Sequence, residues 1–149
     1  MYNFSTLIFD EDAVPHKGVK GNAMNVCVLE DNPAICGMMR ELLELRGHHV
    51  TVYTTGWDCL EVIGSNKWTN QSQPFDLLLV DLLLPDEIQG VEVLAQMQLA
   101  HPHIPLVVIS AVSSLDLQDI QRRYQVEVLQ KPFKMRDLLA LIERDEHTH

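Results

Sequence analysis

The sequence predicts an α/β fold, namely a doubly wound sheet of five parallel strands with helices on both faces. Strand-like runs occur at residues 26–29, 50–53, 77–80, 106–109 and 126–129, and segments with helical spacing separate them. Most of the runs are apolar throughout, which suits strands that are buried on both faces of a parallel sheet. Strands that alternate with helices in this way favour the doubly wound architecture.

The first helix is expected directly after the first strand. Asn32 is a good capping residue, and Pro33 suits the first helical turn. The apolar face of this helix would consist of Ile35, Met38, Met39, Leu42 and Leu43. Gly47 is expected to end the helix.

The middle of the chain predicts two more helices and one long loop. A short helix is expected from residue 57 to about residue 65, and the polar stretch at 66–74 predicts a surface loop. Residues 91–99 have the spacing of a third helix, which Pro102 and Pro105 would stop before the fourth strand.

Two further helices complete the expected order. Ser113 or Ser114 would cap the fourth helix. The apolar residues of the fourth helix are Leu117, Ile120 and Tyr124, and those of the fifth are Met135, Leu138, Leu139 and Ile142.

The composition is that of a single globular domain. The chain has 149 residues, of which 46% are hydrophobic and 21% charged, so it has room for a sizeable core. No apolar stretch approaches the roughly 18 residues that span a bilayer, and the N-terminus lacks the pattern of a signal peptide. We therefore expect a cytoplasmic protein without a membrane partner.

Charge, cysteines and histidines exclude several kinds of site. A net charge of −10 disfavours direct binding to nucleic acid. Cys27, Cys36 and Cys59 are odd in number and form no C-x-x-C pair, which argues against a disulfide framework or a thiolate metal site. The 7 histidines show no metal-ligand spacing and are expected on the surface.

Polar residues follow four of the predicted strands directly or after one intervening residue. Glu30 and Asp31 follow the first, Asp81 the third, Ser110 the fourth and Lys131 lies just beyond the fifth. Ligands of open parallel sheets bind outside the carboxyl ends of the strands, so these side chains are expected at one edge. Clustered carboxylates repel one another unless a cation intervenes, and Mg²⁺ prefers oxygen ligands and phosphate. The sequence thus predicts a site for Mg²⁺ and a phosphoryl group.

At these residues the chain resembles the receiver domain of bacterial two-component response regulators. The matching segments are residues 30–33, 80–85 followed by Gly90, 110–111 and 131–133, and the match runs from about residue 25 to about residue 144. Each segment alone is common, but four in this order after four strands are specific. The resemblance implies the flavodoxin-like fold of receivers.

The resemblance implies a role for each site residue. Asp81 would accept the phosphoryl group, with Lys131 and Ser110 contacting the phosphoryl oxygens. The implied Mg²⁺ ligands are Asp31, Asp81, the backbone carbonyl of Leu83 and, through water, Glu30. Pro132 corresponds to a family proline that usually follows a cis peptide bond.

The implied switch region comprises Ser110, Ala111 and Val128. Members of the family commonly carry an aromatic side chain at the position of Val128, and a valine has no ring to bury or expose. Leu83 stands where a polar side chain is common. One residue more than usual separates Pro85 from Gly90.

The implied function is a phosphorylation-dependent signalling switch that changes the binding of a protein partner. Its donor would be a sensor histidine kinase or a histidine phosphotransfer protein, and it would catalyse its own phosphorylation and slow dephosphorylation. The downstream target stays open. A homodimer through the fourth helix, fifth strand and fifth helix is one alternative.

Two other classes share part of the pattern. A Mg²⁺-dependent phosphohydrolase of the haloacid dehalogenase type also uses an aspartate nucleophile, but it needs a second aspartate where this chain has Leu83. A flavodoxin-like electron carrier needs a phosphate-binding loop rich in Ser, Thr and Gly after the first strand, and residues 30–33 are not of that kind.

The ends of the chain lie outside the resemblance. Residues 1–24 are expected to form an N-terminal extension, 25–146 the receiver domain and 147–149 a tail. The extension would pack on the surface, add an edge strand or be disordered, and Met24 is an alternative natural start. With no second domain in sequence, the chain either acts alone or is a piece of a longer protein.

Overall fold

The sheet consists of five parallel strands, as predicted. The computed structural model describes residues 23–143, so most of the predicted extension (1–22) and the end of the chain (144–149) lie outside the described residues. The strands are β1 Asn25–Leu29, β2 His49–Tyr53, β3 Leu77–Val80, β4 Leu106–Ser110 and β5 Glu127–Gln130. Their order in the sheet is β2-β1-β3-β4-β5, and every neighbouring pair is parallel. The predicted doubly wound fold is confirmed.

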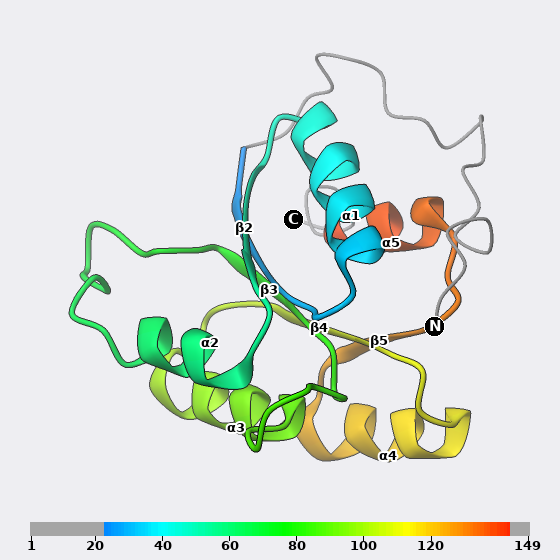
Figure 1. The fold of residues 1–149 in the computed structure, drawn as a ribbon. Helices are drawn as coiled ribbons and strands as arrows, with labels where there is room; N and C mark the ends of the chain where they lie inside the picture. Colours follow the sequence, from blue (N-terminus) through cyan, green and yellow to red (C-terminus); the bar gives the residue numbers. More distant parts are fainter. Residues whose placement is uncertain (1–22, 144–149) are drawn as a thin grey trace.

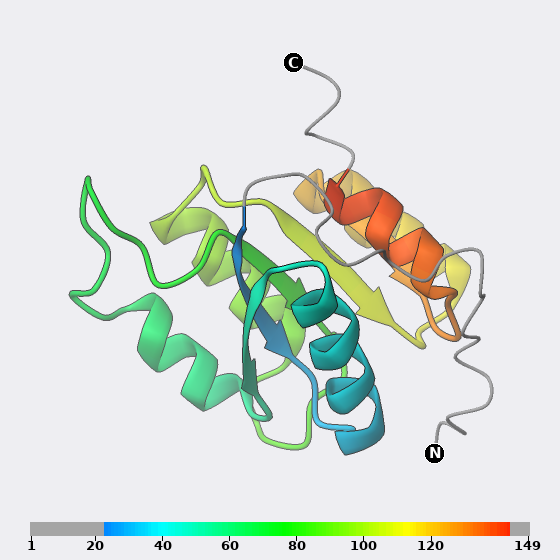
Figure 2. The ribbon, with the colours of Figure 1, turned by 90° about the horizontal axis from the view of Figure 1, so that it is seen from above.

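Helices connect the strands and cover both faces of the sheet. They are α1 Pro33–Leu45, α2 Gly56–Ile63, α3 Gly90–Ala100, α4 Ser114–Tyr124 and α5 Met135–Glu143. Figure 1 shows α1 and α5 on one face and α2, α3 and α4 on the other. In the view from above, α1 and α5 lie on the near side of the sheet (Figure 2).

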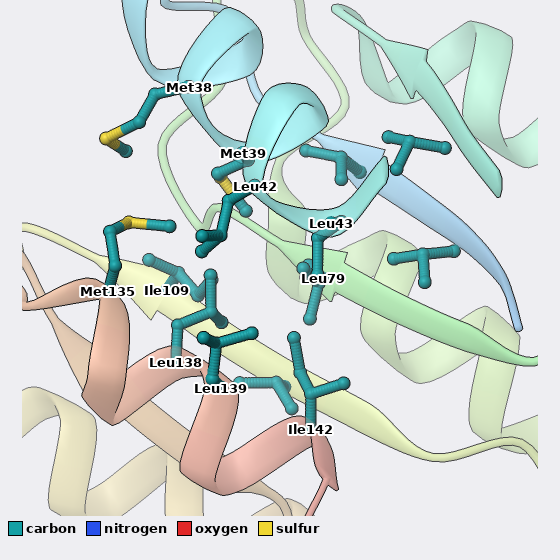
Figure 3. Close-up of a cluster of buried hydrophobic side chains, with 14 of the residues drawn as sticks. Met38, Met39, Leu42, Leu43, Leu79, Ile109, Met135, Leu138, Leu139 and Ile142 are labelled. Atoms are coloured by element: carbon teal, nitrogen blue, oxygen red, sulfur yellow. The ribbon is translucent and has the colours of Figure 1, made fainter. Parts of the chain in front are cut away.

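The core has two layers because successive strand residues point to opposite faces. Val26, Val28, Leu77 and Leu79 belong to the layer under α1 and α5, where every apolar residue predicted for these two helices is buried. Figure 3 shows Met39 and Leu42 of α1 facing α5 above the sheet. The other layer comprises the alternate strand residues and the inner faces of α2, α3 and α4. Burial on both faces explains why the strands read as apolar runs.

Helix starts follow the predicted capping chemistry. The Asn32 side chain accepts hydrogen bonds from the backbone N–H of Ala34 and Ile35. Ser113, one of the two predicted candidates, accepts from Asp116 N and caps α4. Gly47 follows α1 with φ +89°, a left-handed conformation that glycine adopts readily.

Two expectations differ from the structure. Ser110 is the last residue of β4 and does not follow it. His48, expected on the surface, is buried, and its Nδ1 accepts a hydrogen bond from Met24 N. The Met24 carbonyl also accepts from His49 N at 2.8 Å, so this residue of the predicted extension already belongs to the folded unit.

Candidate functional site

The ends of β1 and β3 bring three carboxylates together. Leu29 and Val80 are register partners in the sheet, so the residues that follow them leave the same edge. One oxygen from each of Glu30, Asp31 and Asp81 lies within 4.8 Å of the others. Glu30 and Asp81 are buried and Asp31 is exposed, so the cluster opens to solvent on one side.

Lys131 neutralises part of this cluster. It lies just beyond β5, and its backbone N–H donates to the Ser110 carbonyl at 2.8 Å, which continues the pairing of β4 with β5. Its Nζ lies 3.0 Å from Asp81 Oδ2 and also donates to Glu30 Oε1. The lysine is buried, and the peptide bond to Pro132 is cis.

Burial and the neighbouring opposite charge shift the pKa values of Glu30 and Lys131 in opposite directions. Burial raises the pKa of Glu30 to about 7, although the Lys131 ammonium lowers it in part. Burial by itself lowers the pKa of Lys131, but the hydrogen bond to Glu30 and the charge of Asp81 outweigh it, so that this pKa lies above its ordinary value. The lysine is therefore charged at neutral pH, while Glu30 binds a proton easily.

The raised pKa of Glu30 predicts a pH dependence of stability. Folded Glu30 holds its proton more tightly than unfolded Glu30, so the free energy of unfolding should fall as pH rises from 4.5 to about 7 through this group. Glu30→Gln should remove that component. Urea unfolding of both proteins across this range measures it, with exposed Glu41→Gln as the control. Parallel curves for Glu30→Gln and the parent would contradict the assignment.

The carboxylates and Lys131 line a cleft of about 670 Å³. The lining residues are Glu30, Asp31, Asn32, Pro33, Ala34, Asp81, Leu83, Ala111 and Lys131. Leu83 N donates to Asp81 Oδ1 at 3.1 Å, so both oxygens of Asp81 have a partner. The donor set of carboxylate oxygens at the open side of the cleft fits a hard cation such as Mg²⁺.

Ser110 lies deeper than the other predicted site residues. It is fully buried, and its Oγ accepts a long hydrogen bond, 3.5 Å, from Val112 N. Among the described residues the cleft is lined by its neighbour Ala111 and not by Ser110. The structure thus brings Glu30, Asp31 and Asp81 together, with Lys131 bonded to two of them, and leaves the serine hydroxyl bonded within its own loop.

Val128 and Gln130 occupy β5 beside this loop. Val128 is half-buried and packs against the core layer of α2, α3 and α4. The Gln130 amide donates to the Val112 carbonyl at 3.0 Å and accepts from Ser114 Oγ at 3.0 Å. The sequence analysis missed Gln130, because an isolated glutamine at a strand end carries no pattern that singles it out.

Comparison with known families places the fold and the acidic site in one class of protein. The profile of the response regulator receiver domain matches residues 26–143. The chain belongs to this family, as the resemblance implied. It is a phosphorylation-dependent switch of two-component signalling.

The match covers nearly the whole length of one curated relative and a small part of others. The response regulator receiver protein CpdR of Brucella abortus is 29% identical over 120 residues, which are 80% of this chain and 93% of CpdR. The aerobic respiration control sensor protein ArcB of Escherichia coli is 30% identical over 139 residues, 91% of this chain but 16% of ArcB. The transcriptional regulatory protein ZraR of Escherichia coli is 27% identical over 128 residues, which are 85% of this chain and 27% of ZraR.

Solved structures agree with the fold. A CheY-like receiver domain protein from Methanospirillum hungatei superimposes with a TM-score of 0.71 at 23% identity, over 83% of this chain and 94% of that one. The receiver domain of sensor histidine kinase PA1611 from Pseudomonas aeruginosa gives a TM-score of 0.68 at 19% identity, over 83% of this chain and 97% of that one. That structure has a magnesium ion coordinated in its active site cleft. Receivers as a family bind Mg²⁺ in an acidic site and obtain phosphoryl groups from sensor kinases.

None of the helices within residues 23–143 is long and apolar enough to cross a membrane.

Proposed function

We propose that Asp81 is the phosphoacceptor of this receiver. The observation that supports this choice is the position of its carboxylate, 3.0 Å from the Lys131 ammonium in the lining of an acidic cleft. Asp81 follows β3, the middle strand of the sheet, and so lies between the acidic residues after β1 and Lys131 after β5. This position makes Asp81 the carboxylate best placed between cation and phosphoryl group.

The residues that would hold Mg²⁺ are Asp31, Asp81, the Leu83 carbonyl and, through water, Glu30. Bound Mg²⁺ would neutralise charge on the phosphoryl oxygens in the transition state. Lys131 would supply a second positive charge at the same oxygens, and the buried position of its ammonium strengthens that interaction.

The reaction would be in-line phosphoryl transfer from a phosphohistidine. An Asp81 carboxylate oxygen forms the new bond to phosphorus, the phosphorus–nitrogen bond breaks, and the electron pair of that bond stays on the departing imidazole. The product is an acyl phosphate. Water later attacks its phosphorus, the Asp81 carboxylate leaves, and inorganic phosphate is released, which resets the switch.

Phosphorylation would change the loop between β4 and α4. The phosphoryl oxygens are strong acceptors, so the Ser110 hydroxyl would turn from its own loop toward them. That movement removes the Val112 N–H bond to Ser110 Oγ and shifts Ala111. Val128 offers no aromatic side chain to follow the movement, so the Gln130 contacts to Val112 and Ser114 are the connections that would have to rearrange.

The donor would be a sensor histidine kinase or a histidine phosphotransfer protein, and the output a change in protein binding. A homodimer through α4, β5 and α5 is one arrangement for that output. On this surface Asp119 and Arg123 already pair within α4 at 3.3 Å, which leaves fewer charges for a second copy. A cytoplasmic location suits the three free cysteines and the net charge of −10, which also disfavours nucleic acid as a direct partner.

The test is phosphorylation of the purified protein by a small acyl phosphate with Mg²⁺. We expect one acid-labile phosphoryl group per chain, detected by intact mass spectrometry and mapped to the peptide with Asp81. Continued turnover of an organic phosphate without a stable adduct would instead indicate a hydrolase, and no adduct in the presence of Mg²⁺ would refute the proposal.

Leu83 is expected to lengthen the life of the acyl phosphate. Its side chain lines the cleft and is 55% exposed, so it would shield the phosphoryl group from water. Leu83→Asn should therefore hydrolyse several-fold faster, as measured by the decay of the adduct. Leu99→Asn, at an exposed position near the far end of α3, is the control. An equal or longer lifetime in Leu83→Asn would contradict the shielding role.

A further inference from the structure

The residue before α3 is a glutamine whose side chain does not cap the helix. Gln89 occupies the N-cap position of α3 without a side-chain capping bond. Its amide turns back into the loop after β3, where Oε1 accepts from Leu84 N at 3.2 Å. Nε2 donates to the carbonyls of Leu84 at 3.3 Å and Asp86 at 2.9 Å. One half-buried side chain thus connects three backbone groups of this loop.

The outer part of the same loop is fastened to α2. The Asp86 carboxylate accepts from Gly56 N at 3.2 Å and from Trp57 N at 3.1 Å, the first two N–H groups of that helix. Gly56 and Ile88 touch so closely that a Cβ at Gly56 would lie 2.6 Å from the Ile88 carbonyl oxygen. The loop therefore has little freedom at this end.

The inner part of the loop is fastened to the site. Leu83 N donates to Asp81 Oδ1 at 3.1 Å, and Gly90 N donates to the Leu82 carbonyl at 3.1 Å. Leu83 thus lies between a bond to the phosphoacceptor and the bonds of Gln89 to Leu84. The proposed function requires the Leu83 backbone carbonyl as a cation ligand, and these contacts hold the backbone on both sides of it.

We propose that Gln89 is a positioning residue of the cation site, with Asp86 as its second anchor. This inference rests on the proposed function, since it assumes that the Leu83 carbonyl binds Mg²⁺. Gln89 holds the segment Leu83–Leu84 in one conformation before the ion arrives, so binding does not have to order the loop. Preorganisation of this kind increases affinity without adding a contact to the ligand.

The test separates positioning from folding. Serine is a good N-cap residue and carries no charge, but it is too short to reach Leu84. Gln89→Ser exchanges the loop bonds for a capping bond, so the midpoint of urea unfolding should change little, while the Kd for Mg²⁺ rises about tenfold. Titration calorimetry on the unphosphorylated protein measures the Kd, and hydrogen exchange at Leu84 N should become faster.

Matched variants complete the experiment. Gln96→Ser removes the same amide from an exposed position of α3 and should leave the Kd unchanged. Asp86→Ala should weaken Mg²⁺ binding, and Asp86→Asn, which keeps an acceptor oxygen for α2 without the charge, should restore part of it. If Gln89→Ser does not fold, these two Asp86 variants still test whether fastening of the loop sets the affinity for Mg²⁺.

Each result has a distinct meaning. Unchanged Mg²⁺ affinity in Gln89→Ser and in Asp86→Ala, in a protein that binds Mg²⁺ and is phosphorylated, would overturn the positioning role alone. A parent protein that binds no Mg²⁺ would refute the proposed cation site, and the positioning role with it.

Discussion

Asp81→Asn should abolish phosphorylation and leave the fold intact. The asparagine has nearly the same shape, and its side-chain oxygen retains the ability to accept the hydrogen bond from Leu83 N. It lacks the carboxylate that would attack phosphorus under the proposed function and that supplies one of the clustered oxygens. Lys131 keeps Glu30 as a partner, so we expect a small change in stability and complete loss of the acid-labile adduct.

The matched control for this prediction is Asp58→Asn, at an exposed position in the first turn of α2. It removes the same charge from a residue that does not line the cleft and should be phosphorylated like the parent. Adduct formation by Asp81→Asn at the parental level would show that another carboxylate, such as Asp31 or Glu30, is the acceptor.

Gly90→Ala should destabilise the protein by about 3 kcal/mol or more, because overpacking against backbone atoms cannot be relieved by a rotamer change. A Cβ at this position would lie 2.0 Å from the Asp81 carbonyl oxygen and 2.6 Å from Leu82 Cα. The backbone beside Asp81, the proposed phosphoacceptor, would have to move, so the part of the variant that folds should also be phosphorylated more slowly. Urea unfolding and the rate of adduct formation measure the two effects.

Gly37→Ala is the opposite case in the same protein. Gly37 is an exposed residue of α1, and nothing lies within 4 Å of its added Cβ. Alanine is favoured over glycine in a helix by up to about 1 kcal/mol, so this variant should be more stable than the parent. A similar loss of stability in both variants would contradict the steric argument for Gly90.

The fold was predictable because most of its strands are continuous apolar runs in the sequence. Burial on both faces requires apolar side chains at successive positions, and β3, with four buried residues in a row, is the clearest case. The acidic cluster was predictable for the same reason. Once β1 and β3 are parallel and adjacent, the residues that follow Leu29 and Val80 must meet at one edge.

Contacts between distant side chains were not predictable in this way. His48 was expected on the surface but is buried between distant parts of the chain. Its Nδ1 accepts a hydrogen bond from Met24 N, and its Nε2 lies 3.9 Å from a carboxylate oxygen of Glu143 in α5. Glu143 in turn binds Arg46 from a distance of 97 residues in sequence. Asp86, Gln89 and Gln130 were missed for the same reason, since their partners are set by tertiary structure and not by local spacing.

The position of Gln130 links the chemistry of the site to the surface of the molecule. Gln130 and Lys131 are consecutive in the chain. The Gln130 side chain accepts a hydrogen bond from Ser114 at the start of α4, and the Lys131 ammonium donates to Asp81. A displacement of the Lys131 backbone, produced by a new anion beside the lysine, would pass through one peptide unit to Gln130 and from there to the first turn of α4. If Asp81 is the phosphoacceptor, mechanical coupling between its carboxylate and α4 would run along the main chain of β5, without a rotating aromatic ring.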